Sequence, residues 1–517
     1  MAEAHANEGG LKKTLGAFNL IALGVGAIIG AGLFVRTAAA ASDAAGPAVT
    51  LAFILAALGC AFAGLCYAEF AAMIPIAGSA YAYAYITLGE LVAWIIGWAL
   101  IMEYALGAAT VSIAWSEYLN NLLGGAIPYE WCHSPFESLH FVKGETIAQF
   151  LSADSGLAKF VKDGTLYLSE DIMKTLPANL VDLVSVTQGI VNAPALLILG
   201  LMTMVLIRGT QESAFINAII VFIKVAIVLL FIVIGWGYIN PANYTPYFIP
   251  DNFVGHESFF KHGWGGVVGG AAIVFFAFIG FDAVSTAAQE AKNPKRDMPI
   301  GILGSLVVCT ILYVLFGHVL TGVANWEEFK TAGKEASVTY VIQKYMTGYE
   351  WLGTSVTVAI LAGFSSVILV MLMGQSRVFF TMSNDGLIPK AFGDLHPKFR
   401  TPFKSNLILF AFVGMFAAFV PGSVAGDLTS FGTLFAFVVV CAGILVMRKQ
   451  QPDAPRPFKT PFVPVVPILG ILVCGFMISA LDITTLTVAL IWMAVGLVIY
   501  FLYSRNHSKL RKLNSGK

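Results

Sequence analysis

Twelve apolar stretches, each about as long as a membrane is thick, constrain the fold of this chain more than any other feature. A helix of ~20 apolar residues crosses the ~30 Å hydrocarbon layer of a bilayer. Inside that layer the backbone polar groups must be satisfied within the segment itself, which favours the α-helix. We therefore predict an all-α integral membrane protein with twelve transmembrane helices. They lie near residues 17–39, 46–72, 88–120, 190–207, 213–237, 264–288, 300–322, 352–382, 405–421, 428–447, 462–480 and 482–503.

The composition excludes several other classes of protein. Hydrophobic residues make up 58% of the chain and charged residues 12%, whereas a soluble domain has roughly 25% charged residues. A porin-type barrel is excluded because its strands alternate between apolar and polar residues. The chain has no Walker loop for ATP and no set of residues typical of a nucleophilic or metal-dependent enzyme. We therefore expect no enzyme activity, no cofactor and no nucleic-acid partner.

The distribution of Lys and Arg predicts the orientation in the membrane. If the N-terminus is cytoplasmic and the loops alternate, most of the Lys and Arg residues fall in inner loops, as the positive-inside rule requires. We therefore expect a multi-pass protein of the plasma (inner) membrane with both termini cytoplasmic. The expected organisation is a cytoplasmic segment at 1–16, a core at 17–447, a loop with two further helices at 448–503 and a cytoplasmic tail at 504–517.

One predicted outer segment, about 121–189, is too long for an ordinary connection. It is polar and has more acidic than basic residues, and we interpret it as an outer cap with some helix. Its histidines His133 and His140 have no further close ligand, so we expect no metal there. Its cysteine, Cys132, is the only one outside the apolar stretches and has no obvious partner.

A single lysine, Lys224, lies near the middle of the fifth apolar stretch, FINAIIVFIKVAIVLLFIVIG. A cation at the centre of a spanning helix costs on the order of 2.5–3.5 kcal/mol on insertion scales. Such a cost is tolerated when the ammonium faces the protein interior or a hydrated cavity. Lys224 is therefore a candidate functional residue.

The first apolar stretch contains the glycine-rich sequence GVGAIIGAGLF. One interpretation is close helix packing, since Gly26 and Gly30 have the spacing of a small-residue packing motif. The other is a break in the helix at Gly30-Ala31-Gly32, which would leave backbone groups without helical partners. Such groups are tolerated where they line a cavity, and the N–H groups at the start of a half-helix bind carboxylates.

The sixth apolar stretch contains a second candidate break. In FFAFIGFDAVSTAAQE, Gly280 is followed by Asp282 and small polar residues. Interrupted helices at corresponding positions of two five-helix halves indicate the binding site of an inverted-repeat transporter. Spans 1 and 6 correspond if spans 1–5 and 6–10 are the repeats, so the pair of breaks favours a binding site over packing alone.

Two acidic residues, Glu103 in span 3 and Asp282 in span 6, could interact with Lys224. One alternative is a fixed buried ion pair between Lys224 and either acid. The other is a proton relay in which these groups gain and lose protons, since burial disfavours a charged ammonium. Two more groups, Glu69 and His318, lie near the ends of their stretches and are interpreted as boundary residues.

Three segments together resemble the cationic amino acid transporter family, in its bacterial branch, of the amino acid–polyamine–organocation superfamily. They are GVGAIIGAGLF, FFAFIGFDAVSTAAQEAKNPKRDMPIGI and GQSRVFFTMSNDGLIPKAFGDLHPKFRTP. The resemblance covers essentially the whole chain except 121–189. It implies the LeuT-type fold, in which two inverted repeats of five helices are followed by two additional helices.

The resemblance also implies roles for particular residues. The backbone of Gly30, Ala31 and Gly32 would receive the carboxylate of an amino acid. The carbonyl groups of Ile28, Phe276 and Ile279 would receive its amino group, and Phe276 would act as a gate. Lys224 matches a lysine that takes the place of a sodium ion in proton-coupled relatives. Two positions depart from the family pattern: Ala31 stands where many relatives have Thr or Ser, and Gln289 replaces a common Glu.

These observations predict a secondary transporter that imports amino acids, with protons as the coupling ion. The residues expected to couple protons are Lys224, Glu103 and Asp282. An amino acid/polyamine exchanger and an uncoupled cationic amino acid carrier are the alternatives. The substrate could be cationic or small and neutral, and we favour a broad or neutral range. The expected partners are the amino acid and the lipid bilayer, and Cys132 leaves open a single-span accessory subunit.

Overall fold

The computed structural model describes residues 15–30, 32–74, 79–162, 164–208, 214–253, 255–286, 291–330, 337–397 and 401–514. Within these residues the predicted apolar stretches all form helices. Seven apolar helices are long enough to cross a membrane, and five shorter ones have 10–17 residues. The long ones include α3 (Val49–Met73), α5 (Glu90–Leu122), α10 (Ala214–Gly235), α13 (Pro294–Val323), α15 (Glu350–Asn384), α17 (Gly422–Gln450) and α19 (Ile483–Ile499). The shorter ones are α1 (Ala17–Ile28), α9 (Ala193–Arg208), α11 (Gly263–Val274), α16 (Phe403–Phe419) and α18 (Val465–Ser479).

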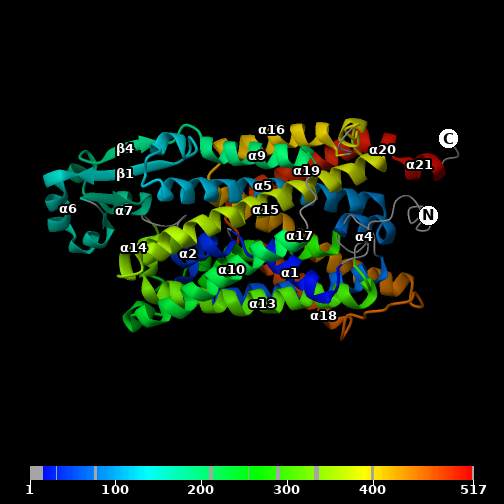
Figure 1. Ribbon diagram of the computed structural model, residues 1–517, viewed down its shortest axis with the longest axis horizontal. Helices are drawn as coiled ribbons and strands as arrows, with labels where there is room; N and C mark the ends of the chain where they lie inside the picture. Colours follow the sequence, from blue (N-terminus) through cyan, green and yellow to red (C-terminus); the bar gives the residue numbers. More distant parts are fainter. Residues whose placement is uncertain are drawn as a thin grey trace.

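The helices form an elongated bundle whose long helices run roughly along its main axis (Figure 1). Helix α5 packs against α15 and α17, while α3 packs against α13 and α11. Helix α1 packs against α13 and α10, which brings the first apolar stretch next to the helix that carries Lys224. Short helices complete the chain: α2 (Thr37–Ala40), α4 (Ser79–Thr87), α12 (Phe281–Thr286), α14 (Ser337–Tyr345), α20 (Arg505–His507) and α21 (Lys509–Asn514).

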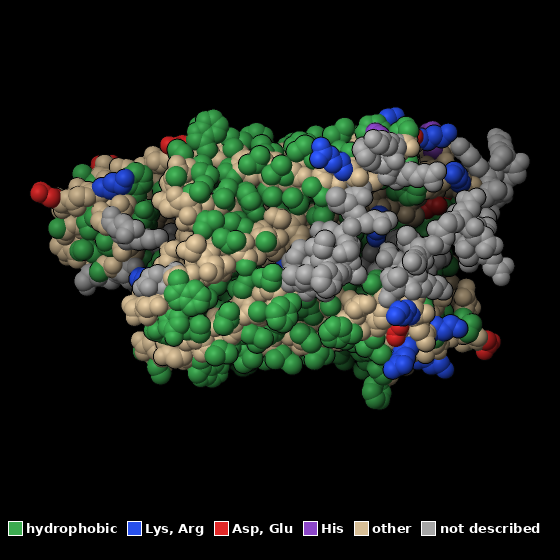
Figure 2. Space-filling model, viewed as in Figure 1, with side chains coloured by type: hydrophobic (Ala, Val, Ile, Leu, Met, Phe, Trp, Pro, Cys, Tyr) green, Lys and Arg blue, Asp and Glu red, His purple; other side chains and the backbone are tan. Residues whose placement is uncertain are grey.

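The surface of the bundle is apolar along its middle. Hydrophobic side chains cover the centre of the face seen in Figure 2, and most of the visible charged side chains lie toward its two ends. Exposed apolar side chains include Phe222 of α10 (75% exposed) and Leu490 of α19 (64% exposed). Large contiguous apolar surfaces are unusual on soluble monomers. The surface is that of a multi-pass membrane protein.

The segment at 121–189 forms a small separate layer at one end of the bundle, and both termini lie at the other end (Figure 1). We expected a cap with some helix, and the structure differs because the segment also contains a four-stranded antiparallel sheet with strand order β2-β3-β1-β4. Its core includes Val142, Phe150 and Leu166. The elements are β1 (Ser138–Lys143), α6 (Ile147–Ala153), β2 (Val161–Lys162), β3 (Thr165–Leu168), α7 (Glu170–Thr175), α8 (Ala178–Val181) and β4 (Ser185–Gln188).

A histidine–carboxylate pair joins this segment to α5. The Nε2 atom of His133 lies 2.9 Å from Oε1 of Glu117, and the ring of His133 stacks on Tyr129 with the centroids 3.7 Å apart. Burial lowers the pKa of His133, but the carboxylates of Glu117 and Glu137 outweigh burial and raise this pKa to about 9. The imidazole is therefore protonated at neutral pH. Within the part of the chain that is described, no group of three or more His, Cys, Asp or Glu could hold a metal ion.

The outer segment should become easier to unfold at high pH. Because the folded pKa of His133 lies above its ordinary value of 6.5, the ion pair contributes fully below pH 6.5. This contribution, on the order of 3 kcal/mol, is lost as the pH rises through about 9. Limited proteolysis of the 121–189 segment should therefore accelerate between pH 7 and pH 10. In a His133→Gln variant the cleavage rate should be high throughout, whereas His140→Gln should behave like wild type; a wild-type rate independent of pH would contradict the assignment.

Two buried acids join separate elements at the end of the bundle where α20 and α21 lie (Figure 1). Glu69, which we interpreted as a boundary residue, is fully buried and accepts two hydrogen bonds from the guanidinium of Arg448, at 3.1 and 2.7 Å. Glu90, at the first turn of α5, accepts hydrogen bonds from Tyr500 at 2.9 Å and from Arg511 at 3.1 Å. The first pair joins α3 to α17, and the second holds the C-terminal segment against α5.

Candidate functional site

The first candidate break is present in the structure. Helix α1 ends at Ile28, and Ile29 has an extended backbone with φ −72° and ψ 104°. The chain resumes as a π-helical turn at Gly32–Arg36, whose residue Leu33 donates its N–H to the carbonyl of Gly30 at 3.1 Å. Ala31 lies outside the described residues. The interruption therefore falls within the glycine-rich sequence, as predicted.

The second candidate break is present as well. Helix α11 passes into a 3₁₀ turn at Phe275–Phe278, Ile279 is extended, and α12 begins at Phe281. Gly280 between them has a φ of +113°, which residues with a side chain rarely adopt. Gln289, which replaces a common Glu of the family pattern, lies outside the described residues.

The two breaks are in direct backbone contact. A Cβ atom added to Gly32 would lie 2.2 Å from Cα of Ala277, and one added to Gly280 would lie 2.9 Å from the carbonyl oxygen of Ala27. Glycine is therefore required at both positions by close approach of the main chains, in addition to the positive φ at Gly280. The structure brings together Ile28, Gly30 and Gly32 from one break with Phe276 and Ile279 from the other, and all five are buried.

Lys224 lies beside the first break. Its Nζ donates to the carbonyl oxygen of Gly26, in the last turn of α1, at 3.0 Å, and the side chain is 3% exposed. A Cβ atom added to Gly363 of α15 would lie 2.8 Å from Cε of Lys224, so the absence of a side chain there makes room for the lysine stem. The ammonium thus links α10 to the end of α1.

Asp282 follows the second break in α12, and Glu103 lies in α5. They are close enough to interact electrostatically, and both are 1% exposed. The hydroxyl of Tyr104 donates to Oδ2 of Asp282 at 2.8 Å. Oε1 of Glu103 has no hydrogen-bond partner among the described residues.

A partly buried ion pair lies beyond the first break, toward the end that carries the outer segment. Arg36, the last residue of the π-helical turn, is 3% exposed and pairs with Asp427 of α17. The nearby carbonyl of Phe34 accepts a hydrogen bond from Tyr118, close to the end of α5. This pair could not be predicted from the sequence, because residues 391 positions apart give no local signal.

Sequence analysis also missed Tyr313, which contacts both breaks. Its hydroxyl lies 3.0 Å from the carbonyl oxygen of Ile28 and 2.9 Å from that of Ala277. A signal was available: tyrosines of membrane helices concentrate at the interfaces, whereas Tyr313 lies well inside the apolar stretch at 300–322.

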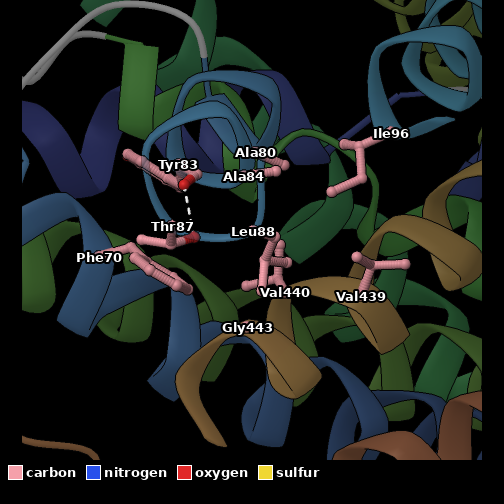
Figure 3. A pocket seen from close by; sticks show the side chains of 10 residues that line it. All are labelled: Phe70, Ala80, Tyr83, Ala84, Thr87, Leu88, Ile96, Val439, Val440 and Gly443. Atoms are coloured by element: carbon pink, nitrogen blue, oxygen red, sulfur yellow. Dashed lines mark hydrogen bonds between the residues drawn. The ribbon is translucent and has the colours of Figure 1, made fainter. Parts of the chain in front are cut away.

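Two cavities among the described residues are lined by residues outside the breaks. One lies between α3, α4, α5 and α17 (Figure 3), and its volume of about 10 Å³ admits at most one water molecule. In the same view Thr87 donates its hydroxyl to the carbonyl of Tyr83 at 2.7 Å. The other, of about 150 Å³, is an apolar groove between α5, α16, α17 and α19.

The apolar neighbours of the breaks come from α13 and α15. A Cβ atom added to Gly30 would lie 3.2 Å from Cγ2 of Val367, and Phe34 packs against Phe316 and Phe364 with ring centroids 5.9 and 6.1 Å apart. These contacts give the first break an apolar environment.

Comparison with known proteins gives a consistent result. The profile of the family described as "Amino acid permease" matches residues 15–505. The chain is 42% identical to the branched-chain amino acid permease BcaP of Bacillus subtilis over 98% of this chain and 97% of the relative. It is 38% identical to the methylthioribose transporter of Bacillus subtilis, with the same coverage. It is 30% identical to the vacuolar cationic amino acid transporter 4 of Arabidopsis thaliana, over 86% of this chain and 64% of the relative.

Proposed function

Because the chain belongs to the amino acid permease family, we propose that it is a secondary active transporter that moves amino acids by alternating access and couples this movement to protons. The observation that carries the proposal is the contact between two broken helices, with a buried lysine bonded to one of them. Interrupted helices that meet near the middle of a membrane are typical of substrate sites in inverted-repeat transporters.

The proposed architecture is the LeuT-type fold. In this arrangement all twelve apolar helices span the membrane, and two inverted repeats of five are followed by α18 and α19. The breaks in the first and sixth spans then occupy equivalent positions of the two repeats. The proposed orientation has both termini cytoplasmic, which is supported by the excess of Lys and Arg in the predicted inner loops.

The backbone at the breaks supplies the groups that an amino acid needs. In the proposed complex, N–H groups at Gly30, Ala31 and Gly32 receive the carboxylate, helped by the positive end of a half-helix. Carbonyl groups of Ile28, Phe276 and Ile279 receive the ammonium. These groups recognise what all amino acids share, so they bind the backbone of the substrate without selecting its side chain.

Protonation of Lys224 is the proposed coupling step. The charged ammonium donates to the carbonyl of Gly26 and so stabilises the end of α1 beside the site. Loss of the proton at this buried position would weaken that bond and release α1 for the return step. Glu103 and Asp282 are proposed as a second proton-exchanging group, at the second break. A fixed ion pair between Lys224 and one of the acids is the alternative, and it predicts exchange without net proton flux.

Amino acids with a neutral, branched apolar side chain are the favoured substrate class. The apolar contacts of Val367, Phe34 and Phe364 around the first break suit such a side chain, and two relatives are named as branched-chain amino acid permeases. Methylthioribose and cationic amino acids are the competing substrates, since other relatives are named for them.

Counterflow in proteoliposomes tests the proposal directly. Liposomes loaded with unlabelled leucine should accumulate labelled leucine from outside more than liposomes loaded with buffer. Loading with methylthioribose or arginine in parallel ranks the competing substrates. Counterflow with methylthioribose and with none of the amino acids would contradict the proposal.

The pair formed by Arg36 and Asp427 should control the outer closure of the site. Asp427→Asn removes the carboxylate that pairs with the buried guanidinium of Arg36, and loss of a hydrogen bond to a charged group costs roughly 1.5–3 kcal/mol. We expect the maximal uptake rate to fall at least tenfold, with the substrate affinity measured by thermal shift changing less than threefold. The matched control is Asp394→Asn, because the exposed pair of Asp394 and Lys404 should be dispensable. An uptake rate equal to wild type in Asp427→Asn would contradict this role.

A further inference from the structure

Tyr313 of α13 is fully buried at the point where the two broken helices meet. Its ring packs against Phe53 and Phe278, with centroids 5.4 and 5.2 Å apart. These contacts hold the ring, so that the hydroxyl reaches the carbonyls of Ile28 and Ala277 at 3.0 and 2.9 Å. One side chain therefore joins the end of α1 to the 3₁₀ turn that precedes α12.

This contact has fewer donors than acceptors, because one hydroxyl hydrogen faces two carbonyl oxygens. A phenol has a single O–H donor, so the hydrogen is shared between the two carbonyl oxygens or moves from one to the other. Both carbonyls lie where the regular helix is interrupted. A buried carbonyl without a donor is unfavourable, so the hydroxyl stabilises the broken conformation as long as no other donor arrives.

We propose that Tyr313 is a positioning residue of the substrate site. Its hydroxyl donates to the carbonyl of Ile28 when no ammonium of an amino acid is bound there. This inference rests on the proposed function, in which the carbonyl of Ile28 receives that ammonium. While the site is empty of substrate, Tyr313 shares its hydrogen with Ile28 and keeps the carbonyl aimed at the site. When the ammonium binds to Ile28, Tyr313 donates fully to Ala277, and both carbonyls remain satisfied.

The exchange of donors has a specific consequence for recognition. A substrate with an ammonium can replace the hydrogen that Tyr313 withdraws from Ile28. A 2-hydroxy acid with the same carboxylate and side chain has a single neutral donor in place of the ammonium, and it gains less from a correctly aimed carbonyl. The loss of the Tyr313 hydroxyl should therefore weaken binding of the amino acid more than binding of its hydroxy analogue.

The test compares Tyr313→Phe with wild type in leucine uptake and in competition by 2-hydroxy-4-methylpentanoate. We expect the KM for leucine to rise about tenfold, which is the size of effect expected for one hydrogen bond that orients a group binding a charge. The inhibition constant of the hydroxy acid should change less than twofold. The matched control is Tyr500→Phe, which removes the hydroxyl of a buried tyrosine that donates to Glu90 at 2.9 Å and should leave both constants unchanged.

Several outcomes would overturn the inference. A KM for leucine equal to wild type in Tyr313→Phe does so, and so does an equal loss of affinity for leucine and the hydroxy acid. If Tyr313→Phe fails to fold, Tyr313→His replaces it, because its shorter ring cannot reach both carbonyls and should give the same selective rise in KM. Failure of wild type to bind leucine at all would contradict the proposed function instead, before any variant is compared.

Discussion

Replacing Lys224 with methionine is expected to abolish uptake driven by a proton gradient, with a decrease of at least about 100-fold in the initial rate. The methionine side chain fills a similar space but carries no charge and no donor, so the carbonyl of Gly26 loses its hydrogen bond to the ammonium. Loss of a charge-assisted hydrogen bond costs roughly 1.5–3 kcal/mol, and a buried acceptor left without a partner adds to that cost. The measurement is uptake of labelled leucine by proteoliposomes with an inward proton gradient.

Two comparisons make the Lys224 result specific. Lys404→Met removes an exposed lysine paired with Asp394, and this control should retain wild-type uptake. Counterflow of leucine in Lys224→Met separates binding from coupling, since an electrically silent exchange should survive at a reduced rate. Full pH-driven uptake in Lys224→Met would show that Lys224 has no part in coupling.

Replacing Gly32 with alanine should have a comparable effect for a different reason. The added Cβ would lie 2.2 Å from Cα and 2.7 Å from the backbone nitrogen of Ala277. These are main-chain atoms of the second break, so they cannot turn aside as a flexible side chain can, and the two breaks must separate. Because a displacement of about 1 Å can cost a positioned site 100-fold in activity, we expect leucine binding by Gly32→Ala to weaken at least 100-fold.

A neighbouring glycine provides the control for this prediction. At Gly30 the added Cβ would meet only the side chain of Val367, at 3.2 Å, and a small shift of that side chain relieves the contact. Gly30→Ala should therefore lose less than tenfold in affinity. Equal affinities of Gly32→Ala and wild type for leucine, determined by thermal shift, would mean that the breaks do not need to touch.

The sequence predicted the features that depend on local composition. Apolar stretches specify helices because hydrocarbon leaves the backbone few alternatives, and glycine clusters in two of them predicted breaks that the structure contains. The resemblance to a transporter family, drawn from the same glycine-rich segments, is confirmed by the match to the amino acid permease family. Lys224 was identified because a lone cation in an apolar stretch is costly.

The features that were missed depend on contacts between distant parts of the chain. The pair of Arg36 and Asp427 and the two carbonyl contacts of Tyr313 join residues from different helices. The sheet within 121–189 was missed because its strands have only two to six residues, too few for a clear alternating pattern. The roles of Ile28, Gly30, Ala31, Gly32, Phe276 and Ile279 toward a substrate stay predictions.

The burial of Cys132 argues against an accessory subunit linked through this cysteine. A disulfide to a partner requires an accessible thiol, and Cys132 has no exposed surface. Burial raises the pKa of its thiol to about 11, so the reactive thiolate is scarce at neutral pH. A linkage at Cys132 would require local opening of the outer segment.

The central claim is that amino acid movement through this protein is coupled to protons. Its most direct test is the uptake of labelled leucine, alanine and arginine into proteoliposomes with and without an inward proton gradient. We expect the gradient to drive accumulation above equilibrium, with leucine ahead of arginine. Uptake that does not depend on the gradient, and that accelerates only when amino acid is present inside, would contradict proton coupling. Lys224 would then be a fixed structural charge.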